Sequence, residues 1–468
     1  AEWRSPYNLV GHLAESWEQQ PDNVTFVFKI RGGVQFHNGA TLTADDAAFS
    51  FTRAQDPEAN NNAFRRSVSE PVEVIDDSTL RVVANKPDAE FLEVINGYIG
   101  QVAIMPRSFA DGGGDFTREA VGTGPFRLAS HQAGSTALLT RFDDYWQPDR
   151  PYLDGIHIVW DTADATLSAA FIAKESDVLT RNDGVQAKPV LDANPDALSD
   201  SWASDFIYGP FFNLTRQPFD DIRVRQALHL TINREDAEAV VTFGDGVISG
   251  PMMIEREGYT LPHAELLQLP GYRMPKDADI AEAVSLLDAA GYGDGFSMDM
   301  GFRSDFACAE SYATNLKQQY AEALNVDVTI QPLESALMRE VQTQTGEYDT
   351  LLTSVNGVAR PGSAVDRWQS SHPNAVAQGI NDPDLDALID AQRVEFDPVA
   401  RGRIFQDIEQ RLFEQMYFAG ISAASLFRMW QPWVHDWRDN RARFASIMNP
   451  SWMWMDLDEA PGDRASAP

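Results

Sequence analysis

The chain has 468 residues, of which 43% are hydrophobic and 10% aromatic, so it is long enough for two or three domains with separate cores. It carries 37 Lys and Arg residues against 70 Asp and Glu residues, a formal net charge of −33 at pH 7, which argues against nucleic acid as a partner. A single cysteine, Cys308, excludes an intramolecular disulfide and a cysteine-based metal site, and no apolar run of about 18 residues indicates a membrane span.

The first third of the chain is predicted to be rich in strands. Apolar residues alternate with others over residues 24–30, which is the period of a half-buried strand. Thr43 is a predicted N-cap because Asp45 and Asp46 follow it in what would be the first turn of a helix. Further strands are predicted at residues 79–84, 137–141 and 156–160.

After Asn213 the pattern becomes mainly helical. A short strand candidate, residues 326–330, lies among the helices, and this alternation predicts α/β layering with a partly parallel sheet. The pairs Gly250–Pro251 and Pro270–Gly271 mark a boundary between the two halves of the chain. The predicted helices cover residues 223–241, 280–290, 310–324, 334–344, 383–394 and 398–415.

The sequence contains no spacing typical of a catalytic or metal site. It lacks a phosphate-binding loop, a dinucleotide fingerprint, a His-Glu-x-x-His helix and a Gly-x-Ser-x-Gly elbow. The eight histidines are widely spread, and capping or turn roles explain the paired acidic residues. We therefore predict no catalytic residue, metal or cofactor. A hydrolase on an α/β scaffold remains the alternative from a different class, although the sequence names neither its nucleophile nor its base.

Nine blocks of sequence follow one another in an order that resembles extracellular solute-binding protein family 5. This family includes oligopeptide-, dipeptide- and nickel-complex-binding proteins of ABC importers. Leu-Ala-Glu-Ser-Trp at residues 13–17 and Gly-Thr-Gly-Pro-Phe-Arg-Leu at residues 122–128 are two of these blocks. The others lie at residues 25–31, 36–39, 42–46, 144–146, 152–154, 213–228 and 286–292.

The resemblance implies an α/β fold of the two-lobed periplasmic-binding-protein type II-like kind, with an extra α+β domain inserted in the first lobe. On this sequence the inserted domain would be residues 1–121, the first lobe residues 122–246 and 432–468, and the second lobe residues 247–431. The family's opening strand has no counterpart here, so we expect residues to be missing upstream of Ala1, and a secretion leader is not present in this chain.

The resemblance also implies a function without catalysis. Such a protein is a monomeric periplasmic receptor that closes on a peptide or peptide-like solute and presents its closed form to the membrane subunits of an ABC importer. Closure follows from ligand contacts on both lobes, which favour the closed form over the open one.

One departure from the family concerns the ligand. Peptide-binding relatives carry Gly-Trp-x-x-Asp-Tyr-x-x-Pro after a Tyr-Asp strand end like Tyr348–Asp349, and its aspartate binds the amino terminus of the peptide. Residues 354–362 here read Ser-Val-Asn-Gly-Val-Ala-Arg-Pro-Gly, with no aspartate and with Arg360 nearby. A buried ammonium without a carboxylate keeps its desolvation cost, so free-amine capture is not expected at this point.

Two other ligand classes fit this departure. Arg360 would suit a carboxylate or phosphate on an anionic organic solute, unless it is a solvated loop residue. An oligosaccharide is the other alternative, because the eleven tryptophans offer rings that stack on sugars, although core packing explains them as well. The predicted ligand-binding residues, each of which core or surface packing would also explain, are Phe64, Tyr208, Phe211, Asn213, Arg303, Asn356, Arg360 and Trp368.

Overall fold

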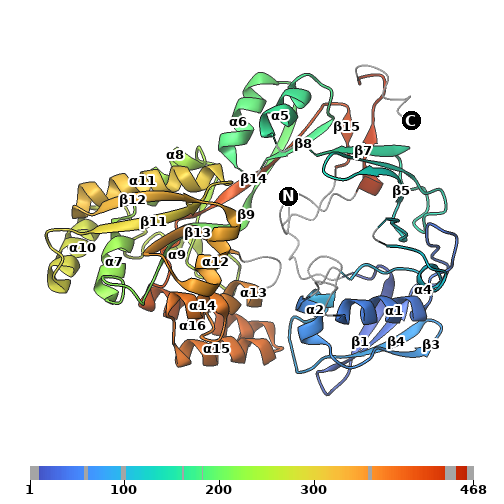
Figure 1. The fold of residues 1–468 in the computed structure, drawn as a ribbon, viewed down its shortest axis with the longest axis horizontal. Helices are drawn as coiled ribbons and strands as arrows, with labels where there is room; N and C mark the ends of the chain where they lie inside the picture. The colour runs from blue at the N-terminus through green and yellow to red at the C-terminus, as the bar shows by residue number, and fades with distance from the viewer. Residues whose placement is uncertain are drawn as a thin grey trace.

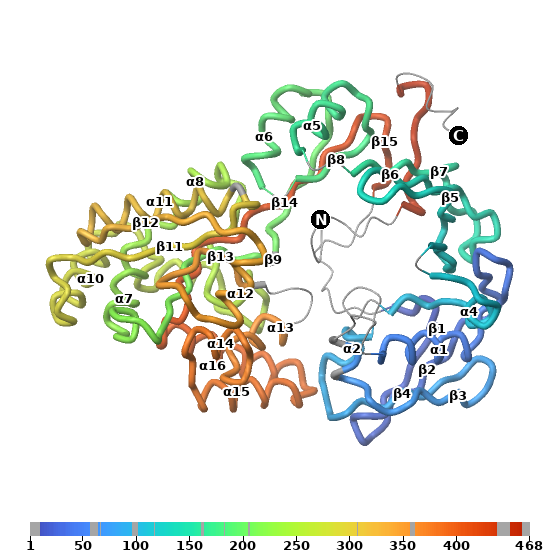
Figure 2. Tube along the Cα trace, viewed as in Figure 1, coloured from blue at the N-terminus to red at the C-terminus, as the bar shows by residue number. Residues whose placement is uncertain are grey.

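The structure is a computed structural model that describes residues 10–56, 62–95, 102–116, 118–160, 163–181, 183–356, 361–437 and 450–460. Figures 1 and 2 show three bodies. We call them the N-terminal body (blue), the middle body (teal to green, with red C-terminal elements) and the large body (green through yellow to orange). The arrangement of helices and sheets confirms the predicted α/β class.

The N-terminal body is a four-stranded antiparallel sheet, in the order β1-β2-β4-β3, with helices packed on it. Phe26, Phe28 and Ile30 of the predicted strand point into its core, which confirms the alternation. The hydroxyl of Thr43 accepts a hydrogen bond from the Asp46 N–H at 3.4 Å, which confirms the predicted cap. The elements are β1 (Ala14–Gln19), β2 (Thr25–Ile30), β3 (Glu73–Asp76), β4 (Thr79–Val83), α1 (Ala44–Gln55), α2 (Asn62–Ser67), α3 (Phe91–Ile95) and α4 (Arg107–Asp111).

The middle body contains a three-stranded antiparallel sheet, β5-β6-β7, and a small core around Phe171 and Val190. C-terminal residues complete it, because Phe427 and Met429 pack into the same small core. Its elements are β5 (Phe126–Gln132), β6 (Thr136–Arg141), β7 (Gly155–Val159), α5 (Asp164–Ile172), β8 (Val178–Arg181), α6 (Gly184–Ala193), β15 (Val434–His435) and β16 (Trp454–Met455).

The large body is built on a mixed sheet in the order β10-β14-β9-β13-β11-β12, and β8 of the middle body pairs with the far end of β14. Strand β11 is parallel to both β12 and β13, whereas β9 is antiparallel to β13 and β14. The strands are β9 (Leu198–Phe212), β10 (Val247–Ile248), β11 (Ser297–Arg303), β12 (Asp327–Leu333), β13 (Thr350–Asn356) and β14 (Ser422–Trp430).

Helices cover both faces of this sheet and enclose two hydrophobic cores. The first core lies under α7 (Ile222–Thr231), α8 (Arg234–Val241), α10 (Asp277–Ala290) and α11 (Ala307–Leu324). The second lies under α12 (Ser335–Glu340), α13 (Pro361–Val365), α14 (Pro373–Gln378), α15 (Pro383–Val394) and α16 (Pro398–Gln415), with the short α9 (His263–Leu266) nearby.

Two strands connect the large body to the other two. The chain enters the large body along β9 and leaves it along β14, and both run across to the middle body in Figure 1. Strand β14 pairs with β9 from Ser422, opposite Tyr208, to Trp430, opposite Leu198, and its last four residues also pair with β8 on the other side. The register shifts between Ala423 and Ser425, and such an irregularity bends a strand locally. The pair of strands that joins the two bodies is therefore irregular at this point.

Most of the predicted helices are confirmed, and two differ in detail. Residues 223–241 form two helices, α7 and α8, because the side chain of Asn233 caps α8 by accepting from the Asp236 N–H at 3.1 Å. Residues 334–344 form α12 followed by a wider π turn, Val341–Thr345.

A buried carboxyl on α16 makes stability depend on pH. Glu409 is 2% exposed and accepts a hydrogen bond from the Leu261 N–H at 2.7 Å, and burial raises its pKa from 4.5 to about 7. Between these two values the folded state holds a proton that the unfolded state has lost, so this group's contribution to stability falls as pH rises from about 4.5 to 7.

Replacing Glu409 by glutamine is expected to remove this dependence and to raise the free energy of unfolding by roughly 1–3 kcal/mol at pH 8, with little change at pH 4.5. The glutamine oxygen still accepts from Leu261, so the packing is retained. Urea unfolding at both pH values measures the effect. If E409Q and the unsubstituted protein lost the same stability over this range, Glu409 would not be the responsible group.

Candidate functional site

The carboxyl ends of three parallel strands meet at one edge of the large sheet. Arg303 is the last residue of β11, Leu333 the last of β12 and Asn356 the last of β13, and Arg303 pairs with Leu333 in register. In Figure 1 this edge, with α12 and α13 beside it, faces the N-terminal body. Ligands of open α/β sheets bind outside the carboxyl ends of the strands, so this edge is the candidate site.

Arg303 already has an anionic partner at this edge. Its Nε and Nη2 donate to the two carboxylate oxygens of Asp305 at 2.7 and 2.6 Å, and its guanidinium lies 4.0 Å from the centre of the Phe306 ring. These hydrogen bonds lower the pKa of Asp305 to about 2, and Asp305 also accepts from the Ser335 hydroxyl at 3.0 Å. An anionic ligand at Arg303 would therefore compete with Asp305.

Tyr208 lies on the sheet near this arginine. It is 6% exposed, its ring stacks on Tyr312 at 5.6 Å, and burial raises its pKa well above 10. Its neighbour Cys308 is also buried, which raises the pKa of the thiol to about 12. A thiol with that pKa is not a nucleophile at neutral pH, so Cys308 offers no catalytic group here.

Phe211 and Trp368 come together in the core under α12 to α16. Their rings stack at 5.6 Å, both are buried, and Phe418 packs against Phe211 at 4.4 Å. Ring packing of this kind stabilises the large body. Any role of Phe211 and Trp368 in binding a ligand remains a prediction.

Arg367 lies against these rings and has no anionic partner in the described residues. Its guanidinium is 4.1 Å from the centre of the Phe211 ring, and its Nη1 donates to the carbonyl of Ser354, two residues before the end of β13, at 3.1 Å. Burial lowers its pKa to about 10. None of the ion pairs formed by the described residues involves Arg367. No motif in the sequence singles out this residue.

Two other predicted residues lie away from the carboxyl edge. Asn213 is fully buried, and its amide donates to the carbonyls of Gly346 and Tyr348 at 2.8 and 2.7 Å. Phe64 is in the core of the N-terminal body, stacked on Phe51 at 5.2 Å. Arg360 and the side chain of Asn356 lie outside the described residues, so the eight predicted ligand contacts stay predictions.

A buried ion pair joins the N-terminal body to the large body beside this edge. Glu90 Oε1 accepts from Arg401 Nη2 at 2.6 Å and from the Gly362 N–H at 2.9 Å. The Ala89 N–H also donates to the carbonyl of Arg393 at 2.8 Å. The side chains of Glu90 and Arg401 are 5% and 9% exposed, so the contact is desolvated. Gly362 follows closely after residues 357–360, where the family's ligand-binding aspartate would be expected.

Arg401 is held firmly within the large body. Its Nε donates to the carbonyl of Gln392 at 3.0 Å, and its Nη2 donates to the side-chain oxygen of Gln392 at 2.8 Å. Glu90 therefore meets a guanidinium that is already oriented by α15 and α16.

Comparisons with known proteins agree with this architecture. Residues 8–375 match the model of "Bacterial extracellular solute-binding proteins, family 5 Middle". A curated relative, the glutathione-binding protein GsiB of Pectobacterium atrosepticum, is 26% identical over 339 residues, which cover 69% of this chain and 60% of that protein. The match therefore spans less than two thirds of the relative's length.

Solved structures share the fold over nearly the whole chain. A putative peptide binding protein AppA from Clostridium difficile has a TM-score of 0.82 at 19% identity, covering 97% of this chain and 93% of that one. The ABC transporter substrate binding protein CtaP from Listeria monocytogenes has a TM-score of 0.80 at 19% identity, covering 95% and 90%. The predicted two-lobed fold class is thereby confirmed.

Among the described residues, no helix is both long enough and apolar enough to span a bilayer. The family model covers most of the chain, including the N-terminal body, the middle body from β5 to α6, and the large body from β9 to the start of α14. The chain belongs to the bacterial extracellular solute-binding proteins, family 5.

Proposed function

We propose that the protein is a periplasmic receptor of an ABC importer, which binds a solute at the carboxyl edge of the large sheet and delivers it to the membrane subunits. The observation that carries the proposal is the contact of Glu90 with Arg401 and Gly362, which brings the N-terminal body onto the large body at that edge. Because only β9 and β14 connect the large body to the rest, this contact can form or break by a hinge motion. The receptor would act as a monomer and catalyse nothing.

The hinge proposed here separates the large body as a whole from the other two bodies, and α7 and α8 share one core with α10 and α11 in that large body. The boundaries predicted from the family resemblance instead place α7 and α8 in the first lobe, and they stay a prediction. In that prediction the inserted domain is residues 1–121, the first lobe residues 122–246 and 432–468, and the second lobe residues 247–431. The predicted ligand contacts are retained as candidates, and Arg367 is added because it lies next to β13 without an anionic partner in the described part of the chain.

A peptide or peptide-like solute is the first candidate ligand, supported by the curated relative named for binding glutathione. Glutathione carries two carboxylates, and a partly buried guanidinium such as that of Arg367 favours a ligand with an anionic group. An anionic organic solute is the second candidate on the same observation. An oligosaccharide would leave Arg367 without a charge partner, which is costly for a desolvated cation.

Native mass spectrometry of protein purified without denaturation tests the proposal, because a closed receptor retains its solute. We expect an added mass that corresponds to a peptide or a small organic anion, and saturable heat on titration with reduced glutathione or short peptides. Turnover of ester or peptide substrates that a single Ser or Asp substitution abolishes would instead support the hydrolase alternative.

Replacing Arg360 by alanine is expected to weaken the binding of an anionic solute by about 2 kcal/mol, if a buried ion pair is lost. Calorimetric titration with the solute found by mass spectrometry measures the change. Arg118, whose side chain is 84% exposed, provides the control, since R118A should leave affinity unchanged. Equal affinities for R360A and R118A would place Arg360 on the solvated surface.

A further inference from the structure

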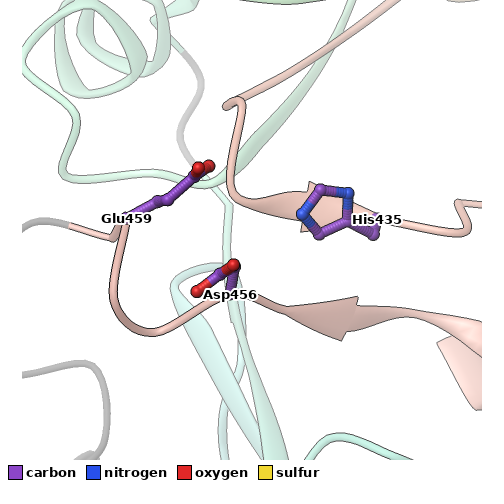
Figure 3. Close-up of side chains that lie close together, drawn as sticks. All are labelled: His435, Asp456 and Glu459. Atoms are coloured by element: carbon purple, nitrogen blue, oxygen red, sulfur yellow. The ribbon is translucent and has the colours of Figure 1, made fainter.

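Three side chains near the C-terminal end of the described chain converge on one point. His435, Asp456 and Glu459 each offer one ligand atom, and these atoms all lie within 4.8 Å of one another. Figure 3 shows the imidazole and the two carboxyl groups grouped beside β15 and β16. The cluster belongs to the middle body, away from the carboxyl edge of the large sheet.

The backbone determines this convergence. His435 of β15 pairs directly with Trp454 of antiparallel β16, and Asp456 lies two residues further along, where its N–H donates to the carbonyl of Trp433 at 2.9 Å. Side chains two residues apart share a face, so His435 and Asp456 are diagonal neighbours on one side of the hairpin. The Ala460 N–H then donates to the Asp456 carbonyl at 3.2 Å and closes a turn. This turn returns Glu459 to the same point.

Other contacts orient the ligand groups. The His435 ring stacks on Trp454 with centroids 4.1 Å apart and planes inclined by 24°, which constrains the plane of the imidazole. One oxygen of Asp456 accepts from the Asp458 N–H at 3.0 Å. In the described chain, neither Asp456 nor Glu459 forms an ion pair with a Lys or Arg side chain.

We propose that His435, Asp456 and Glu459 bind a first-row transition-metal dication, with Zn²⁺ as the preferred ion. One imidazole nitrogen with two carboxylate oxygens is a donor set that Zn²⁺ accepts, whereas Ca²⁺ and Mg²⁺ require oxygen ligands only. A dication also neutralises two adjacent carboxylates that lack a cationic side chain. Three protein ligands leave at least one coordination position for water.

The bound ion would fasten the C-terminal segment to the middle body. Asp456 and Glu459 belong to residues 450–460, which are separated along the chain from β15 by residues 436–449. Next to the site, Trp433 Nε1 donates to Asp177 at 2.8 Å, in the turn before β8. The metal would therefore link residues 456–459 to the part of the middle body where β8 pairs with β14.

Calorimetric titration of the full chain with Zn²⁺, in buffer freed of metals by a chelating resin, tests the proposal. We expect one saturable site, and we expect H435Q, D456N and E459Q each to weaken Zn²⁺ binding by about tenfold or more. His131 supplies a matched control, because it is an exposed histidine that also contacts a tryptophan, Trp160, but has no such cluster. H131Q should bind Zn²⁺ like the unsubstituted protein.

Two results would overturn the assignment. The first is the absence of a saturable Zn²⁺ site, and the second is a site whose affinity all three substitutions leave unchanged. Glu459 is exposed, so E459Q is expected to keep the thermal midpoint of the metal-free protein and to separate loss of a ligand from loss of folding. Titration with Co²⁺ adds a spectrum, since its visible absorption should report a bound imidazole that H435Q removes.

Discussion

Replacing Glu90 by alanine is expected to open the receptor and to weaken solute binding. The substitution leaves Arg401 desolvated without its carboxylate, and removing one partner of a buried ion pair costs about 3–5 kcal/mol. Separation of the N-terminal body from the large body returns Arg401 to water and relieves this cost. A solute that binds only the closed form then loses about tenfold in affinity for each 1.4 kcal/mol by which closure is disfavoured.

Small-angle scattering measures the opening directly, as a larger radius of gyration of solute-free E90A. Titration with reduced glutathione, or with the solute found by mass spectrometry, measures the affinity. E90Q should have a smaller effect, because its side-chain oxygen can still accept from the Gly362 N–H while the charge is lost. Replacing both partners by methionine should recover part of the closure, since the pair is then exchanged for apolar packing of similar volume.

Arg411 provides a control within one body. It donates to both carboxylate oxygens of Asp382 at 2.9 Å, and both residues belong to the large body. R411Q should reduce stability without changing the radius of gyration. The closing role of Glu90 would be refuted by an E90A protein whose scattering and affinity match those of R411Q.

The sequence is sufficient to predict elements that bury one face. Residues 24–30 alternate because β2 packs one side on the N-terminal body, and the helices α15 and α16 show their apolar stripes for the same reason. The sequence does not predict the central strands of the large sheet, because these strands do not have one buried and one exposed face. Ser422 to Met429 of β14 are buried on both faces of the large sheet, so no alternation is present to be detected.

The candidate site is harder to predict because its contacts join distant segments. Glu90 contacts Gly362 and Arg401, which are 272 and 311 residues further along the chain. Nothing in the local sequence around Glu90 distinguishes it from the other carboxylates of this acidic protein. The family resemblance predicts Arg303 as a ligand-binding residue. Its ion pair with Asp305 depends on the geometry at the end of β11 and is known only from the structure.

Replacing Asp279 by alanine is expected to destabilise the large body by about 3–5 kcal/mol, the second large effect. Asp279 of α10 is fully buried and holds two cations and a backbone amide. One carboxylate oxygen accepts from Arg273 Nε at 2.7 Å, and the other accepts from Lys276 Nζ at 2.7 Å and from the Gly271 N–H at 2.9 Å. Without the carboxylate, the buried ammonium of Lys276 loses its charge partner.

The pH dependence of the destabilisation by D279A shows whether it comes from the unpaired charge of Lys276. Burial lowers the pKa of Lys276 from 10.5 to about 8, although its hydrogen bond to Asp279 opposes the decrease. Between pH 8 and 10.5 the unfolded state binds the proton that the folded state has released, so this group's contribution to stability increases as pH rises through that window. In D279A the pKa of Lys276 should fall further, and the increase should begin at a lower pH.

The loss in free energy of unfolding caused by D279A should therefore be largest near pH 7. It should be smaller near pH 9.5, where Lys276 is mostly neutral in both folded proteins. Urea unfolding at the two pH values measures it. The neighbouring Asp277 is exposed in the first turn of the same helix, so D277N should change stability by no more than about 0.5 kcal/mol. Two results would contradict this account: a D279A protein as stable as D277N, or a D279A protein whose free energy of unfolding falls by the same amount at both pH values. Either would mean that burial of the Lys276 ammonium does not require the Asp279 carboxylate.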